Sequence, residues 1–171
     1  MARLLALLGA LLLGFAHAEK YMNLTTLTGK NNVSVLECWQ LSIPFQTDDE
    51  PGVKGLDVLW MGELANASTT VIPGRFDGGL HNAPFKQWVW FITGVIQLSL
   101  PNGTGTALVN GGKYGLIYAD DTKDISGWGH ETVYPGADET IALTIPVQDG
   151  INPNHTVLHD GPCILDEQIW I

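Results

Sequence analysis

The sequence predicts an all-β domain, built as a sandwich or a barrel. From residue 53 onward, short apolar runs recur about every ten residues, and glycine, proline and asparagine turns separate them. After residue 18, no long stretch carries the apolar periodicity of a helix. Regularly spaced short strands with such turns are typical of sandwiches and barrels. There is no linker and no internal repeat, so we expect a single domain over residues 19–171.

Residues 1–18 have the features of a secretory signal peptide. A basic start at Arg3 precedes an almost wholly apolar run over residues 4–15, and Ala16-His17-Ala18 has the small-x-small form of a signal peptidase site. The apolar run is too short to span a bilayer. We therefore expect a secreted mature chain that begins near Glu19, with no membrane attachment.

The number of glycosylation sequons supports the same expectation. Several asparagines fit the acceptor pattern Asn-x-Ser/Thr for N-linked glycosylation. So many in a short chain behind a signal peptide predict a secreted glycoprotein with these asparagines on exposed turns. They are Asn23, Asn32, Asn66, Asn102 and Asn154.

The two cysteines, Cys38 and Cys163, lie near the two ends of the mature chain. In an oxidising compartment the simplest expectation is one disulfide that closes nearly the whole domain. Loop-closure entropy predicts that such a bond stabilises the fold by about 4–5 kcal/mol. A metal-thiolate or catalytic role is the weaker reading, because no ligand or base pattern accompanies either cysteine in the sequence.

The charge balance restricts the partners. The chain has 8 basic and 18 acidic residues and a formal net charge of −10. An acidic surface repels phosphate backbones and anionic membranes, so nucleic-acid and membrane binding are not expected. We expect the partner to be a small-molecule substrate or ligand.

The individual strands are predicted from composition and turn signals. Residues 19–30 are polar and rich in threonine, which favours an exposed arm or an edge strand. Residues 33–45 contain β-branched and aromatic side chains, which favour a strand. Further strands are expected at residues 56–61, 68–72, 87–92, 95–100, 107–109, 114–119, 131–134 and 140–147. Turns are expected at residues 73–74, 77–79, 101–103, 110–112, 127 and 135–136.

The stretch from Gly79 to His130 carries the most specific pattern. Its first nine residues read Gly-Leu-His-Asn-Ala-Pro-Phe-Lys-Gln, and its last four read Gly-Trp-Gly-His. His81 and His130 therefore stand near its two ends, with two apolar runs and a turn region between them. Two histidines at the ends of paired strands indicate a pocket inside a small barrel.

This pattern resembles the cupin superfamily, whose fold is a jelly-roll β-barrel. Metal-binding cupins have a first motif of His-x-His followed by Glu and Gly, and a second motif that ends in Gly-x-x-His. The spacing is kept at His81, Gly94 and His130. Two ligand positions differ, because Ala83 replaces the second histidine and Gln87 replaces the glutamate.

Two more positions of this chain depart from the second cupin motif. Ile125 stands where the motif has proline, and Tyr134 stands where it has asparagine. The resemblance covers about residues 71–147. Within the superfamily, the chain resembles a subgroup of small cupin-like proteins common in fungi and bacteria. It implies a small-molecule enzyme of specialised metabolism, namely a metal-independent cyclase, isomerase or dehydratase. The alternatives are a metal-dependent dioxygenase and a non-catalytic secreted protein that binds a ligand or interacts with a host.

The motif residues give weak support for a metal. A catalytic divalent site needs at least three good donors. His81 and His130 offer imidazoles, but Gln87 offers only a neutral amide oxygen. We expect no resident cofactor, and a weakly held divalent ion at the two histidines stays open as an alternative. Asp120 or Asp121 would complete its ligand set.

Proton transfer is the preferred chemistry. Histidine side chains exchange protons near neutral pH, and a neighbouring carboxylate can orient the ring. Asp121 or Asp120 is expected to do so here. The alternative is that the histidines are hydrogen-bonded structural residues. The expected catalytic residues are His81, Gln87, Asp121 and His130.

Strand alternation predicts the walls of the pocket. If Gln87 faces the interior, Val89 and Phe91 share its face. Trp88 and Trp90 then face the other way, either into a second layer or into a homodimer interface. An apolar lining with few polar groups is the usual character of a small-molecule site. The expected substrate-binding residues are Phe91, Tyr118 and Trp128, with Trp60 as a further neighbour.

Overall fold

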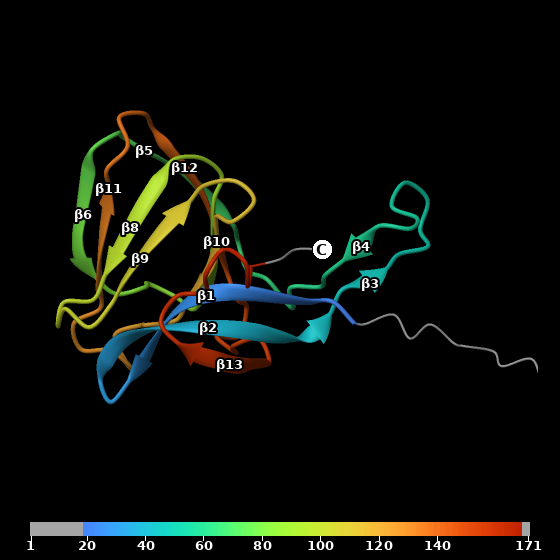
Figure 1. Ribbon diagram of the computed structural model, residues 1–171, viewed down its shortest axis with the longest axis horizontal. Coiled ribbons are helices and arrows are strands. Elements are labelled where there is room, and N and C mark those ends of the chain that lie inside the picture. Colours follow the sequence, from blue (N-terminus) through green and yellow to red (C-terminus); the bar gives the residue numbers. More distant parts are fainter. Residues whose placement is uncertain (1–18, 169–171) are drawn as a thin grey trace, which may run out of the picture.

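The computed structural model describes residues 19–168, which fold into β-sheets without a helix (Figure 1). The predicted all-β class is confirmed. One sheet contains, in spatial order, β13 (His155–Asp160), β2 (Val33–Pro44), β1 (Tyr21–Lys30), β10 (Leu116–Ala119), β7 (Gln87–Phe91), β12 (Thr140–Pro146) and β5 (Ser68–Ile72). The other contains β6 (Phe76–His81), β11 (His130–Tyr134), β8 (Val95–Ser99) and β9 (Thr106–Asn110). The short strands β3 (Gln46–Thr47) and β4 (Asp57–Val58) pair with each other and project from the body (Figure 1).

Strand β1 lies inside the seven-stranded sheet, between β2 and β10. It is antiparallel to β2 and parallel to β10, with Thr26 opposite Tyr118. Leu24, Thr25 and Leu27 are buried along with Thr26. The expectation of an exposed arm or edge strand was therefore wrong. Threonine is β-branched and suits a strand, so a threonine-rich segment is polar in composition and still packs inside a sheet.

The seven-stranded sheet buries apolar side chains on both of its faces. One cluster lies between the two large sheets and includes Leu27, Leu36, Phe91, Ile96, Leu98, Ile117 and Ala142. The other covers the opposite face and includes Met22, Leu24, Trp39, Leu41, Trp88, Leu116 and Tyr118. Phe45, Leu59 and Met61 pack on this second cluster. The two clusters explain why so many short strands of this chain are apolar on both sides.

Trp88 and Trp90 belong to the second layer. Trp88 is fully buried, and Trp90 packs against the same cluster. Strand alternation left two possibilities for these tryptophans, a second layer or a homodimer interface. Their burial within this chain corresponds to the second layer. Because Trp88 fills its site, its replacement by alanine is expected to cost about 3–5 kcal/mol of stability.

Three segments differ from their sequence predictions. Of residues 56–61 only Asp57–Val58 forms a strand, and Trp60 beyond it is 70% exposed. The expected turn at residues 77–79 lies within β6, where Gly79 has a φ of 62° and the pairing with β11 shifts register. A glycine at positive φ suits such a bulge, so the glycines bend the strand without ending it. Residues 155–160, for which no strand was predicted, form β13.

The predicted disulfide between Cys38 and Cys163 is present and joins residues 125 positions apart. It attaches the segment after β13 to the middle of β2. The backbone N–H of Cys163 also donates to the Thr25 hydroxyl at 3.0 Å. The C-terminal segment is therefore tied to β1 and β2 by a covalent bond and a hydrogen bond.

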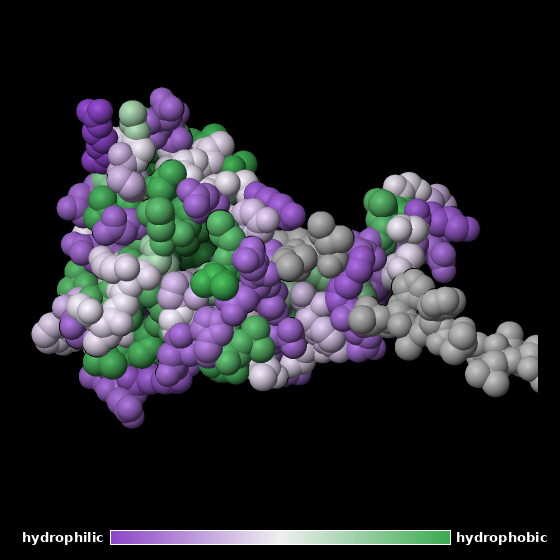
Figure 2. Space-filling model, viewed as in Figure 1, coloured by the Kyte–Doolittle hydropathy of each residue, from purple (hydrophilic) through white to green (hydrophobic). Residues whose placement is uncertain are grey.

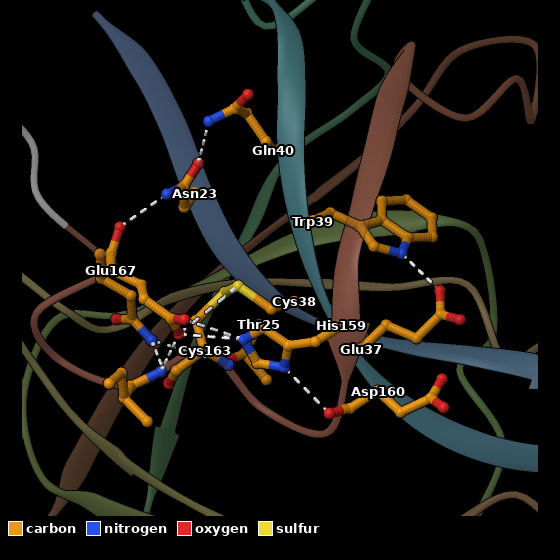
Figure 3. Close-up of a disulfide and its surroundings, with 12 residues drawn as sticks. Asn23, Thr25, Glu37, Cys38, Trp39, Gln40, His159, Asp160, Cys163 and Glu167 are labelled. Atoms are coloured by element: carbon orange, nitrogen blue, oxygen red, sulfur yellow. Dashed lines mark hydrogen bonds and ion pairs between the residues drawn. A yellow bond between two sulfur atoms is a disulfide. The ribbon is translucent and has the colours of Figure 1, made fainter.

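Four of the sequon asparagines, Asn32, Asn66, Asn102 and Asn154, are exposed and lie outside the named strands. Asn23 differs, because it lies within β1 and both ends of its amide are hydrogen-bonded. Its Nδ2 donates to the Glu167 carbonyl at 2.8 Å, and its Oδ1 accepts from the Gln40 side chain at 3.0 Å (Figure 3). The expectation of an exposed turn was wrong for Asn23.

The surface mixes polar and apolar side chains. Figure 2 shows apolar atoms among polar ones over the face that carries β8 and β9, and Leu108 of β9 is largely exposed. Among the described residues no helix is long and apolar enough to cross a membrane. The signal-peptide prediction for residues 1–18 lies outside the described part of the chain.

Candidate functional site

A cavity of about 360 Å³ lies between the two large sheets. Its size suits a small organic molecule. Polar groups of His81, Gln87 and His130 contribute to the wall, and the remainder is mainly apolar. The principal other lining residues are Phe76, Val89, Phe91, Leu98, Ile117, Thr132, Tyr134 and Ala142.

Strands β6 and β11 bring the two histidines together. His81 and His130 are direct partners in the antiparallel register, and their ring centroids are 4.7 Å apart. Gly129 permits this approach. Its φ is 75°, and a Cβ at this position would overlap the carbonyl oxygen of His81. Glycine alone accommodates both conditions, so the glycine directly before His130 allows His130 to lie beside His81.

A buried carboxylate orients His130. Its Nδ1 lies 2.7 Å from Oδ2 of Asp121, and Asp121 is completely buried. The Ser34 hydroxyl donates to the same carboxylate oxygen at 2.7 Å. A carboxylate accepts the proton of Nδ1 and leaves Nε2 as the nitrogen with an available lone pair. His130 therefore has the tautomer of a general base.

The loop that carries Asp121 is held by side chains that the sequence did not single out. The Asn82 amide donates to the carbonyl oxygens of Asp121 and Ser126, both at 2.9 Å. The Ser126 hydroxyl accepts from the Gly129 backbone N–H at 3.1 Å and bonds to Ser34 at 2.7 Å. Asn82, Ser34 and Ser126 lie far apart in sequence, and no motif spacing connects them.

His81 is the more exposed imidazole. Its Nδ1 lies 3.0 Å from the carbonyl oxygen of Gly79, which leaves Nε2 as the acceptor nitrogen when the ring is neutral. Gln87 is only 7% exposed, and its Oε1 has no hydrogen-bond partner among the described residues. A buried unpaired amide oxygen costs about 1–3 kcal/mol. A bound molecule with a hydrogen-bond donor would remove that cost.

Asp120 lies on the other side of β10 from the cavity. Its carboxylate accepts from the Asn152 amide at 2.5 Å, and the Tyr118 hydroxyl donates to the same Asn152 side chain at 3.3 Å. Burial raises the pKa of the Asp120 carboxyl, and its hydrogen bonds oppose that effect. Of the two candidate carboxylates, only Asp121 contacts a histidine of the cavity.

The donor set does not fit the metal that the cupin resemblance implies. Ala83 lines the cavity without a donor, and no carboxylate of the described residues lines it. Asp121 accepts from Nδ1 of His130 and so stands behind the ring. Two imidazoles and a neutral amide oxygen are a poor set for a tightly held divalent ion.

The predicted lining residues divide into two groups. Phe91 lines the cavity together with Val89, as alternation from Gln87 predicts. Tyr118 does not, because it faces the second layer, where its ring centroid is 4.9 Å from that of Trp88. Trp128 is 67% exposed and lies outside the wall, and so does Trp60. Ile117 and Ala119 take the inward positions of β10.

Two residues of the cavity wall, Thr132 and Tyr134, were not predicted from the sequence. Strand alternation along β11, counted from His130, would have identified both. His130, Thr132 and Tyr134 all line the cavity, and four residues of strand span about 14 Å. The Tyr134 ring lies 6.1 Å from that of Phe76 and 6.4 Å from that of Phe91. Burial raises the pKa of Tyr134 and keeps its phenol protonated. The cavity thus has an imidazole end and an aromatic end.

The chain matches neither a known protein-family model nor a curated protein sequence.

Proposed function

We propose that this chain is a cupin-like jelly-roll enzyme that transfers protons on a small, largely apolar molecule. Two features support the jelly roll. A four-stranded and a seven-stranded sheet enclose a cavity, and the two histidines at kept motif positions lie at its wall. Fold alone does not assign a reaction.

The Asp121–His130 pair is the observation that carries the proposal. A histidine whose Nδ1 is bound by a buried carboxylate is oriented to use Nε2 as a base. This pair adjoins a mainly apolar cavity, and a second imidazole lies 4.7 Å away between ring centroids. A purely structural histidine would not need an orienting carboxylate, a cavity and an imidazole partner together.

The arrangement accounts for the steps of an isomerisation or a cyclisation. Nε2 of His130 removes a proton from a carbon beside a carbonyl group, and Oε1 of Gln87, which has no partner among the described residues, accepts a hydrogen bond from a donor group of the bound molecule. His81 starts the cycle protonated at Nε2 and returns that proton to another carbon or to the oxygen. His130 then releases its proton to solvent, and His81 takes one up again. In a dehydration, His81 protonates a hydroxyl group that leaves as water. The proton count balances in each case, and no redox partner is required.

The two ends of the cavity suggest the substrate class. An aromatic or other flat apolar group fits beside Phe76, Phe91 and Tyr134, and an enolisable carbonyl fits near the histidines. The Tyr134 hydroxyl can bind an oxygen at the far end. Such molecules are common in specialised metabolism, to which we assign the enzyme by analogy with its cupin resemblance.

A secreted glycoprotein is the proposed form of the enzyme. The signal-like first 18 residues, four exposed sequons and a long-range disulfide support it.

The test measures proton exchange without knowledge of the natural substrate. 2-Tetralone, a flat aromatic ketone, is incubated with the protein in D₂O, and loss of the signals of its α-protons is followed by NMR. We expect exchange at least about a hundredfold faster than with free imidazole at the same concentration. The His130→Gln and His81→Gln variants should lose most of this gain. The His159→Gln variant, changed at a histidine outside the cavity, should retain it.

Two outcomes would overturn the proposal. Exchange no faster than with free imidazole, or equal in His130→Gln and the native protein, would show that His130 is not a base. Shifts of the tetralone signals without exchange would favour a ligand-binding protein. A metal-dependent reaction would instead require about one equivalent of a transition metal in protein purified without added metal.

A further inference from the structure

The disulfide lies in a cluster of metal-binding side chains from separate parts of the chain. Cys38 is in β2, and His159 of β13 is its direct partner in the antiparallel register. Cys163 and Glu167 follow β13 in the C-terminal segment. Figure 3 shows the imidazole of His159 directed toward the carboxylate of Glu167, and that carboxylate beside the disulfide. None of these contacts concerns the cavity of the proposed enzyme.

The donor atoms are already close together. Single ligand atoms of Cys38, His159 and Glu167 all lie within 4.8 Å of one another. Oε2 of Glu167 is 4.0 Å from Sγ of Cys38, and Cys163 Sγ is bonded to that sulfur. One sulfur, one imidazole nitrogen and one carboxylate oxygen thus lie within mutual reach, and the second sulfur is bonded to the first.

The surrounding hydrogen bonds direct these donors toward each other. His159 Nδ1 lies 2.9 Å from the Asp160 carbonyl oxygen, and Nε2 lies 3.0 Å from Oε1 of Glu167. A backbone carbonyl at one imidazole nitrogen is the contact that commonly orients a metal-binding histidine. The Glu167 carboxylate is fixed in turn, because Oε2 accepts from the Ile164 backbone N–H at 2.7 Å.

We propose that these four side chains bind one zinc ion when the Cys38–Cys163 disulfide is reduced. A dithiol supplies two electrons and two protons to the disulfide and becomes a cyclic disulfide itself. Zn²⁺ then displaces the two thiol protons and the proton on Nε2 of His159, all of which pass to solvent, and is bound by two thiolates, Nε2 of His159 and a Glu167 oxygen. Two sulfurs, a nitrogen and an oxygen form a closed tetrahedral zinc site with no position left for water.

The required movement is small. In a tetrahedral site with Zn–S bonds of about 2.3 Å, the two sulfurs are about 3.8 Å apart. Cys38 is fixed within β2, whereas Cys163 lies outside the strands and can move away from it. His159 and Glu167 are partly exposed, which gives zinc a route to the buried sulfurs.

Zinc would connect the same two segments as the disulfide. The C-terminal segment would therefore stay attached to β2 under oxidising conditions through a covalent bond and under reducing conditions through a metal ion. Zinc binding to such a site contributes directly to folding stability.

The test uses the full chain, reduced with dithiothreitol that is then removed without oxygen. Cobalt(II) serves as a visible substitute for zinc. We expect one equivalent of cobalt to bind with a thiolate-to-metal charge-transfer band and tetrahedral d–d bands, and zinc to displace it. The oxidised protein should bind neither ion at this site. Zinc should also restore much of the melting temperature lost on reduction.

Variants separate the folded site from adventitious thiol binding. His159→Gln and Glu167→Gln leave the disulfide intact, so their folding is verified in the oxidised form. We expect each to weaken cobalt binding by more than about tenfold. His155→Gln, at a histidine that stacks on Trp39, should not change it. Equal affinity in native, His159→Gln and Glu167→Gln proteins would overturn the proposal. So would a reduced protein whose melting transition zinc does not restore.

Discussion

Asp121 and His130 form a hydrogen-bonded pair 2.7 Å long in which the carboxylate is wholly buried and the imidazole lines the cavity. The pair spans nine positions of sequence, and Asn82 holds the intervening loop against the end of β6. The proposed chemistry depends on this contact, because it decides which imidazole nitrogen is available to a substrate.

Replacing Asp121 by Asn tests the role of the pair. The amide keeps the volume of the carboxylate but offers His130 either a donor or a neutral acceptor, so the ring loses its fixed tautomer. We expect tetralone exchange to slow by about ten- to a thousandfold with little change in tetralone affinity. NMR exchange rates and ligand titration measure the two effects separately. A lower affinity with an unchanged rate at saturation would contradict the prediction.

Restoring the cupin ligands tests the metal interpretation. The double variant Ala83→His, Gln87→Glu adds an imidazole and a carboxylate to the cavity wall beside His81 and His130. We expect it to bind Ni²⁺ or Zn²⁺ at least about a hundredfold more tightly than the native protein does in its oxidised form, since four good donors would replace a poor set. Calorimetry on both proteins measures the difference. Equally tight binding by the native cavity would show that its donors suffice.

Removing the disulfide should destabilise the fold. The bond joins residues 125 positions apart, and loop-closure entropy predicts a loss of about 4–5 kcal/mol in the Cys38→Ser, Cys163→Ser variant. Urea unfolding in the absence of metal ions measures it. A loss below about 1 kcal/mol would mean that the C-terminal segment stays docked through its hydrogen bonds alone.

The buried carboxyl of Asp120 predicts a pH dependence of stability. Burial raises the pKa of this group, so its charged form is disfavoured in the folded protein. Its favourable contribution is complete below the unfolded pKa of about 3.9 and is lost as pH rises through the folded pKa. The Asp120→Asn variant does not titrate at this position and keeps an oxygen for Asn152.

We therefore expect the unfolding free energy of the native protein to fall relative to that of Asp120→Asn as pH rises from about 4 to 7. Urea unfolding of both proteins across this range measures the difference, and Asp121 is common to both. A constant difference, or one of opposite sign, would contradict the prediction.

Glycan occupancy should follow the positions of the sequons. In protein secreted from eukaryotic cells, we expect glycans at exposed Asn32, Asn66, Asn102 and Asn154. Asn23 should be unmodified, because its amide bonds to Gln40 and to the Glu167 carbonyl in the folded protein. Peptide mass spectrometry after enzymatic deglycosylation locates the modified residues. A fully modified Asn23 would mean that the glycan is added before the strand β1 packs and that folding tolerates it.

Much of the fold was predictable because local patterns specify strands and turns. Spacing predicted the strands near β5, β7, β8 and β12 closely, and alternation placed Gln87, Val89 and Phe91 on one face. Alternation counted from His130 would also have assigned Thr132 and Tyr134 to the cavity. The same rule shows why Tyr118 faces away, because it has the parity of Asp120 rather than of Ile117 and Ala119.

The remainder depended on contacts between distant residues. The central position of β1 arises from its parallel pairing with β10, whose paired residues lie more than ninety positions further along the chain, and no local composition signals this pairing. The distinction between Asp120 and Asp121 depends on how the chain leaves β10. The Asn82, Ser34 and Ser126 contacts form only after the two sheets have packed.

The sequence by itself determined that the described chain is all-β, that Cys38 would pair with Cys163, and that His81 and His130 carry the most specific pattern. These are consequences of periodicity, of cysteine number and of motif spacing. The tertiary structure decided that Asp121 orients His130, that Trp88 belongs to a second layer, and that His159 and Glu167 surround the disulfide. Each of these depends on side chains that meet across sheets, and a meeting in space has no fixed spacing in sequence.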